Sequence, residues 1–173
     1  MDRQEERIET LAGSLLAVDV GIRTGFAVFE ATGKLIRFGS HNYGSVTRLR
    51  QAVWRHLAEI ENLKYLVLEG GGRLATIWQQ VAEKQEVHVL QLYAETWRKD
   101  LLYPREQRNG KMAKSNADDA ARKIIRESKL PLPSSLRHDA AEAILVGKWA
   151  ILYGNIGQEY LLQPLPLKHK DHL

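Results

Sequence analysis

The sequence predicts an α/β fold: a five-stranded mixed sheet, three antiparallel strands followed by parallel ones, flanked by helices on both faces. Three β-rich stretches joined by tight turns come first, and two more short apolar stretches alternate with segments of helical period. Further helical segments follow, enough to cover both faces of a sheet. With 173 residues, 44% of them hydrophobic, the chain is expected to form one domain with a substantial core.

The first β-rich stretch, "LLAVDVGIRTGFAVFE" (15–30), carries a single acid, Asp19, before its turn. Gly21 and Gly25 follow at short spacing and predict a tight hairpin. A third strand is expected over 35–43, which completes an antiparallel meander. A buried carboxylate costs free energy unless something pairs with it, so we expect Asp19 to have a partner.

The remaining pattern alternates helices and strands. The expected elements are a helix over 45–62, a strand over 64–70, a helix after the glycines at 70–72, a strand over 86–93, and helices over 94–102, 114–129 and 136–154. Ser115 is predicted as the N-cap of the helix over 114–129, and the last helix is expected to begin near Ser135. A short charged extension (1–12) and a loosely ordered tail (about 158–173) are expected to flank the single domain.

Composition excludes several classes of protein. The chain has no cysteine, so disulfides and thiolate metal sites are excluded, and a reducing, cytoplasmic compartment is expected. Residues 1–10 are dense in charge and lack the apolar core of a secretory signal. No apolar run approaches the ~20 residues that a membrane span needs, so no membrane partner is expected.

The net charge of +4 is unevenly spread along the chain. Between Arg98 and Lys129 there are ten Lys/Arg against five Asp/Glu, which leaves the remaining residues near −1. Such a run is typical either of a solvated helix face or of a strip that contacts phosphates. The phosphate-contacting interpretation is favoured only if an acidic site accompanies this basic segment.

Four acids form a pattern that indicates metal chemistry. Asp19 and Glu69 each end an apolar strand, and the carboxyl ends of neighbouring strands meet at one edge of a sheet. Asp139 and Glu142 lie three apart and share one face of the last helix. Each acid alone is typical of a cap or of solvated surface, but four converging carboxylates would repel one another. Mg²⁺ prefers carboxylate oxygen, and two ions ~4 Å apart can clamp an in-line phosphoryl displacement.

Three stretches, "AVDVGIRTGFAVFE", "YLVLEGG" and "RHDAAEAI", in this order resemble the RuvC-type Holliday junction resolvases of the RNase H-like superfamily. That family has an Asp ending strand one in a D-x-G-x-x-x-G hairpin, a Glu ending strand four, and a D-x-x-D/E pair opening the last helix. The resemblance spans roughly residues 15–153. It implies an RNase H-like fold and a homodimeric endonuclease that cuts branched DNA with two Mg²⁺ ions, or with Mn²⁺ in their place.

The resemblance also implies roles for individual residues. The catalytic metal ligands would be Asp19, Glu69, Asp139 and Glu142. Contacts to DNA phosphates would come from Lys111 and Lys114, and less strongly from Arg98 and Lys99. Arg23 in the hairpin is either a phosphate contact or a solvated turn residue, and His138 either an auxiliary group at the scissile phosphate or a helix-start residue bonded to backbone.

The sequence departs from the family at one position. Many members carry an aromatic residue about one helical turn after the strand-four Glu, but position 72 here is Gly and the first aromatic is Trp78. Junction specificity therefore stays open, with a nuclease for RNA or RNA–DNA hybrid and a binding-only module as alternatives. An actin-like or sugar-kinase phosphotransferase, suggested by "DVGIRTG", would need a second related half and a second phosphate motif.

Two lesser expectations concern packing. The hairpin glycines are expected to keep the hairpin thin beside a DNA backbone. Most of the four tryptophans, Trp54, Trp78, Trp97 and Trp149, are expected in the core, with Trp97 also able to brace DNA.

Overall fold

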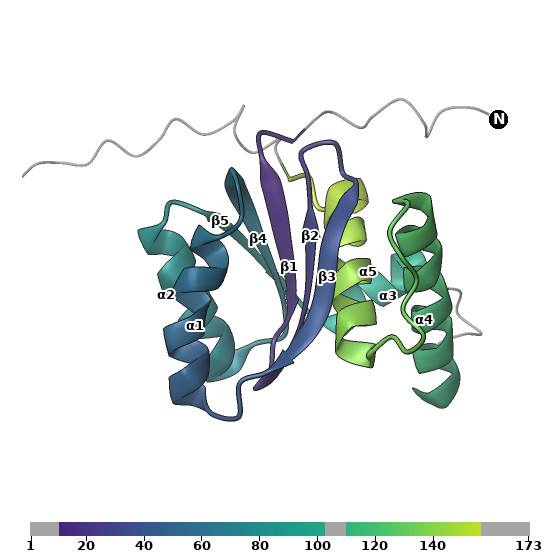
Figure 1. The fold of residues 1–173 in the computed structure, drawn as a ribbon, viewed down its shortest axis with the longest axis horizontal. Coiled ribbons are helices and arrows are strands. Elements are labelled where there is room, and N and C mark those ends of the chain that lie inside the picture. Colours follow the sequence, from purple (N-terminus) through teal and green to yellow (C-terminus); the bar gives the residue numbers. More distant parts are fainter. Residues whose placement is uncertain (1–10, 103–109, 157–173) are drawn as a thin grey trace, which may run out of the picture.

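The computed structural model describes residues 11–102 and 110–156, with the side chains of 110–114 left out. Its elements are β1 (Ser14–Asp19), β2 (Arg23–Phe29), β3 (Leu35–Asn42), α1 (Val46–Ala58), β4 (Leu63–Glu69), α2 (Gly72–Lys84), β5 (His88–Leu92), α3 (Ala94–Leu101), α4 (Gly110–Glu127) and α5 (His138–Tyr153). Helices α1 and α2 cover one face of the sheet, and α5 lies against the other face with α4 outside it (Figure 1). The predicted fold class is confirmed.

The sheet has the strand order β3-β2-β1-β4-β5. Strands β1, β2 and β3 pair antiparallel, whereas β4 pairs parallel to both β1 and β5. In this register Asp19 lies opposite Glu69 on one side and opposite Gly25 on the other. The two strand-ending acids predicted from the sequence are therefore direct neighbours.

Helix α5 is apolar almost all round, because it lies between the sheet and the outer helices. Its small residues allow this close approach. A Cβ atom on Gly147 would lie 2.2 Å from the ring of Phe29 and 3.0 Å from the Cβ of Ala17. The side chains of α5 and of the facing strand positions form one hydrophobic cluster, and α1 and α2 form a second cluster on the opposite face.

Two helix starts differ from the predictions. Helix α4 begins at Gly110, so the predicted N-cap Ser115 lies inside it, because Lys111–Lys114 are good helix formers that extend the helix backwards. Helix α5 begins at His138, since Arg137 still has extended backbone angles (φ −71°, ψ 144°). The expected N-terminal extension (all but its last two residues) and the expected tail fall outside the described residues.

The tryptophans divide into core and surface. Trp78 and Trp97 are fully buried, and Trp149 is buried with its indole N–H donating to Asp100 (2.7 Å). Trp54 is 51% exposed, because position 54 lies outside the buried stripe of α1. The expectation that most of the tryptophans lie in the core is therefore confirmed. Since Trp97 is enclosed, it has no ring face to offer DNA.

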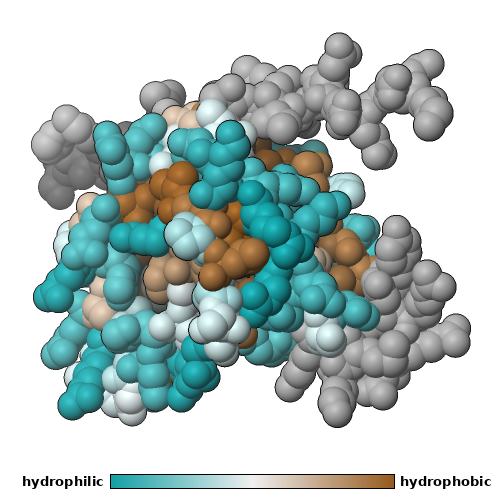
Figure 2. All heavy atoms as spheres, turned by 45° about the vertical axis from the view of Figure 1, so that its right-hand side comes forward, coloured by the Kyte–Doolittle hydropathy of each residue, from teal (hydrophilic) through white to brown (hydrophobic). Residues whose placement is uncertain are grey.

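Apolar side chains also reach the outer surface of the molecule. Figure 2 shows a band of apolar surface bordered by hydrophilic side chains on the face turned forward there. The large apolar side chains exposed among the described residues are Ile36, Trp54, Val89, Tyr93, Leu132, Leu152 and Tyr153. Within the same residues, none of the helices combines the length and the apolar character needed to cross a membrane.

Candidate metal centre at the sheet edge

Strand alternation directs Asp19 and Glu69 to the same face. Successive side chains of a strand point to opposite faces of the sheet. On β1, Leu15 and Ala17 pack in the cluster that contains α5, as do Tyr65 and Val67 on β4. The next residues of the same parity are the two acids, so both carboxylates end their strands facing α5.

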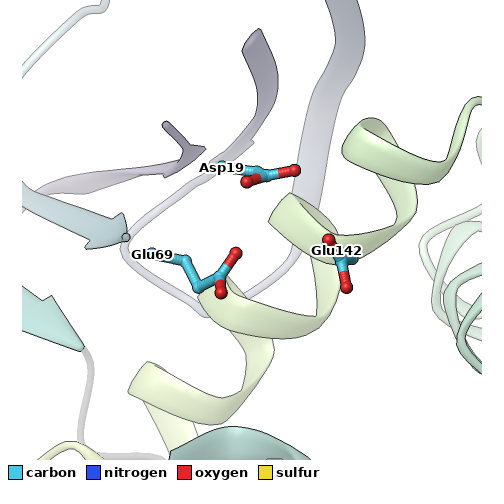
Figure 3. Close-up of side chains that lie close together, drawn as sticks. All are labelled: Asp19, Glu69 and Glu142. Atoms are coloured by element: carbon cyan, nitrogen blue, oxygen red, sulfur yellow. The ribbon is translucent and has the colours of Figure 1, made fainter. Parts of the chain in front are cut away.

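Helix α5 adds the third carboxylate. Glu142 lies in the second turn of α5 and is buried, with 7% of its surface exposed. One carboxylate oxygen each from Asp19, Glu69 and Glu142 lie within 4.8 Å of one another. Figure 3 shows the three side chains converging from two strand ends and the helix. All donors are hard carboxylate oxygens, the set that Mg²⁺ and Mn²⁺ prefer.

The electrostatics of this group show a shortage of positive charge. Burial, together with the neighbouring negative charges of Glu69 and Glu142, raises the pKa of Asp19 to about 8. Burial also raises the pKa of Glu69, an effect partly offset by its hydrogen bond with Asp19 and by the guanidinium of Arg98. Without a metal ion the Asp19–Glu69 pair therefore retains a proton at neutral pH, and a divalent ion would replace that proton.

Two basic side chains already contact Glu142. Arg98 of α3 donates from Nη2 to Glu142 Oε1 at 2.5 Å, and His138 Nε2 lies 3.3 Å from the same oxygen. The buried ring of Trp97 anchors α3, and the Arg98 guanidinium stands 5.2 Å from the centre of that ring. Arg98, expected as a contact to DNA phosphate, thus pairs with a carboxylate of the site.

Asp139 lies beside the three carboxylates but makes other contacts. Its Oδ2 accepts a hydrogen bond from Ser40 of β3 (2.6 Å), and its Oδ1 accepts one from the backbone N–H of Ala140 (2.9 Å). Arg137 Nε is 3.8 Å from the same Oδ1. Of the four predicted ligands, the structure brings three together and places the fourth at their margin.

Gly25 explains how α5 reaches the strand ends. A Cβ atom at this position would lie 1.9 Å from the backbone oxygen of Asp139 and 2.8 Å from the nitrogen of Ala140. The first turn of α5 therefore packs directly on the backbone of β2 at a position that has no side chain. We expected this glycine to keep the hairpin thin for DNA; in the structure it makes room for the helix.

Two of the other predicted basic residues have described side chains, and both are exposed. Arg23 is exposed at the start of β2, and Lys99 is exposed on α3. Lys111 and Lys114 belong to the first turns of α4, and their side chains fall outside the described residues.

One aromatic residue at this edge was missed by the sequence reasoning. Tyr93 directly follows Leu92, the partner of Glu69 in the sheet, and is 58% exposed. A Cβ atom on Gly71 would lie 3.0 Å from its hydroxyl, so the ring flanks the glycine turn before α2. Trp78 is buried, and the space around Gly72 is open. The sequence contained a signal for this residue, because Tyr93 directly follows β5, the next strand along the chain after the one that ends at Glu69.

Comparison with known proteins bears on the fold. No family model and no curated protein sequence matches the chain. A solved structure of T. thermophilus RuvC in complex with Holliday junction substrate matches with a TM-score of 0.58 and 16% identity, over 84% of this chain and 96% of that one. A structure of a simian T-cell lymphotropic virus intasome in complex with PP2A regulatory subunit B56 gamma matches at 10% identity, over 94% of this chain and 62% of that one. Its TM-score of 0.34 is too low to carry an argument. The chain therefore has a RuvC-like fold.

Proposed function

We propose that the chain is a divalent-metal-dependent endonuclease that hydrolyses phosphodiester bonds in branched DNA such as four-way junctions. The observation that carries the proposal is the group of three carboxylates, Asp19, Glu69 and Glu142, where two strand ends meet helix α5 of a RuvC-like fold. The group is rich in hard oxygen donors and short of positive charge, so it fits Mg²⁺, with Mn²⁺ as a substitute. We propose two ions, with Asp139 as a further ligand.

The chain contributes rigid, correctly charged ligands to this chemistry. A bound Mg²⁺ would supply Lewis acidity, lowering the pKa of the attacking water and offsetting charge on the phosphate. Asp19 and Glu69 are fixed by the sheet register, and Glu142 by a helix that is buried over most of its length. The proton held by Asp19 must leave before it can act as a ligand, so ligation is coupled to deprotonation. Ser40 fixes the direction of Asp139.

Substrate contacts come from the residues around this group. Lys99, Lys111, Lys114 and Arg23 are proposed to contact phosphates, and His138 to assist at the scissile phosphate. Arg98 is proposed to hold Glu142 in place and to meet substrate phosphate when Glu142 binds metal. A homodimer is proposed because two symmetric strands of a junction must be cut.

The decisive experiment compares three substrates, a mobile four-way junction, matched linear duplex and RNA–DNA hybrid, each with Mg²⁺ or with EDTA. We expect paired, symmetrical nicks in the junction with Mg²⁺ only, and a loss of at least about 10³-fold in Asp19→Asn. Asp119→Asn, the same acid-to-amide change on the exposed face of α4, is the matched control and should cut normally. Equal cutting of linear duplex, or preferred cutting of the hybrid, would reject junction specificity, and cutting by Asp19→Asn would reject the metal centre.

One observation favours a second candidate, a module that binds branched DNA without cutting it. Glu142 is already paired with Arg98 and His138, a state that satisfies its charge with no metal ion. This candidate predicts tight junction binding, no cleavage with either Mg²⁺ or Mn²⁺, and no effect of either ion on the melting temperature.

A further inference from the structure

Helix α1 carries a concentration of positive charge that the sequence reasoning placed elsewhere. Its thirteen residues include Arg48, Arg50, Arg55 and His56 and no acid. All three arginines are exposed, and in the part of the chain that the structure describes none of them forms an ion pair. In α4, by contrast, Arg122 and Lys123 are paired with acids one turn away. Among the described residues, the arginines of α1 therefore differ from these α4 cations in having no acid paired with them.

Strand β3 extends this charge across the sheet edge. Arg37 and His41 have the same parity as Tyr43, which packs in the cluster with α1, so they lie on the α1 face of β3. The rings of His41 and His56 are 6.4 Å apart, and Arg37, His41 and Arg55 all act on His56 to lower its pKa. Burial lowers that pKa most, and Glu59 opposes the shift. Arg37 of β3 and Arg55 of α1 thus both act on one residue between the two elements, with Glu59 acting in the opposite sense.

Spacing along α1 makes these residues a strip. Arg48 and Arg55 are seven residues apart, so they lie on the same side of the helix with a rise of about 10 Å between them. The Arg48 guanidinium lies 3.7 Å from where a Cβ atom of Gly44 would stand, at the loop from β3. We call Arg37, His41, Arg48 and Arg55 the β3–α1 strip.

The β3–α1 strip begins where the carboxylate site ends. Asp19, Gly25 and Ser40 form one row across three strands, and Ser40 contacts Asp139 on the α5 face. His41 is the next residue and points to the α1 face. Because β3 is the edge strand, a polyanion can pass around it from the site onto α1 without crossing the sheet.

We propose that the β3–α1 strip binds the phosphate backbone of a duplex arm of the DNA substrate, outside the strand that is cut. The inference rests on the proposed function for the identity of the polyanion. Unpaired arginines spaced along a helix match a charged backbone that continues past the scissile phosphate. The strip therefore adds affinity and salt dependence, and leaves the chemical step unchanged.

The test is junction binding in an Asp19→Asn background, with arms of about 25 or about 8 base pairs, as a function of salt. Replacing Arg37, Arg48 and Arg55 by Gln should weaken binding of the long-armed junction at least tenfold and reduce the slope of log K against log salt by two to three. Binding of the short-armed junction should change less. The double variant Arg48→Gln/Arg55→Gln, which spares Arg37 and its contact with Phe26, should lose about two of those slope units.

The matched control removes the same charge from the far end of the sheet, through Lys34→Gln, Lys64→Gln and Lys84→Gln, all exposed. It should weaken binding less than twofold. An equal loss of junction binding in the control, or an unchanged salt slope in the triple variant, would overturn the proposal. So would a triple variant that loses binding to anionic phospholipid vesicles but keeps its binding to the junction. With Asp19 restored, junction cleavage at saturating enzyme should match the parent; absence of cleavage in the parent itself would reject the proposed function and leave the binding result intact.

Discussion

The two faces of the sheet hold their helices in different ways. On one face α5 is buried along nearly its whole length, between the strands and α4, and it is the helix that supplies Glu142. On the other face α1 and α2 bury a single stripe and present charge to solvent. An enclosed helix positions a ligand with little freedom, whereas a half-exposed helix presents side chains that a large substrate can reach. This difference agrees with our proposals that the α5 face carries the chemistry and that the α1 face adds contacts to a duplex arm of the substrate.

The largest effect is expected from a methyl group added on the α5 face. Gly25→Ala places a Cβ against the backbone of Asp139, which cannot rotate away, so α5 must shift. We expect cleavage to be lost and unfolding free energy to fall by about 1–3 kcal/mol. Gly39→Ala on the α1 face is the matched control, since its Cβ would meet the ring of Phe26, a side chain that can move. Equal effects of the two changes on melting temperature and cleavage would erase the distinction between the faces.

The next effect concerns proton and metal at Asp19. Its pKa rises from an ordinary 3.8 to about 8 on folding, so the folded chain holds the proton more tightly than the unfolded chain. The contribution of Asp19 to the stability of the metal-free protein is therefore fully present below about pH 4. It is lost as the pH rises from there through 8. Thermal melts should show Mg²⁺ raising the melting temperature more at pH 8 than at pH 5.

Asp19→Asn should flatten that pH dependence and abolish the response to Mg²⁺, while Asp119→Asn keeps both. A response to Mg²⁺ of the same size at the two pH values would contradict proton–metal competition at this site.

A smaller effect is expected from the ion pair between α3 and α5. Arg98→Met leaves Glu142 beside two carboxylates with His138 as its one basic contact among the described residues, and should lower unfolding free energy by about 1–2 kcal/mol. Adding Glu142→Gln should recover part of this loss, and the double-mutant cycle measures the coupling. Lys123→Met, which breaks the exposed pair with Glu127, should change stability by less than about 0.5 kcal/mol. Strict additivity at positions 98 and 142 would show that the pair contributes nothing.

The smallest effect is expected at the exposed aromatic ring by the glycine turn. Tyr93→Ala should weaken junction binding about fivefold, the loss of one base–aromatic contact, and leave melting temperature unchanged. Tyr153 has a similarly exposed ring but lies at the C-terminal end of α5, away from Glu142. Tyr153→Ala should therefore leave junction binding unchanged. A loss of binding in both variants, measured by titration with labelled junction, would point to a general surface effect.

The sequence was sufficient for the strands and their acids because those signals are local. Apolar runs that end at Asp19 and Glu69 specify both the strand and the position of the carboxylate, and the period of two specifies the face. The rotation of α5 was not predictable, since a spacing of three puts Asp139 and Glu142 on one side of the helix without saying which turns inward. That choice follows from contacts of Gly25 and Ser40 far away in the chain.

Charge was the least predictable feature. Counting Lys and Arg identified the segment from residue 98 onward, but within it Arg98 pairs with Glu142 and Arg122 with Asp118. The unpaired arginines are in α1, inside the portion of the sequence whose total is near neutral. A net count cannot distinguish a cation that faces solvent from one that has an acid beside it, because that depends on tertiary packing.

The burial of α5 also sets the order in which the protein acquires its chemistry. Ser40 and Asp139 are 99 residues apart, and all five strands of the described sheet precede α5 in the chain. During synthesis the sheet and the outer helices α1 and α2 can therefore form while Glu142 has yet to leave the ribosome. A partly made chain therefore holds only two of the three carboxylates, and docking of one late, apolar helix would complete the proposed ion-binding site.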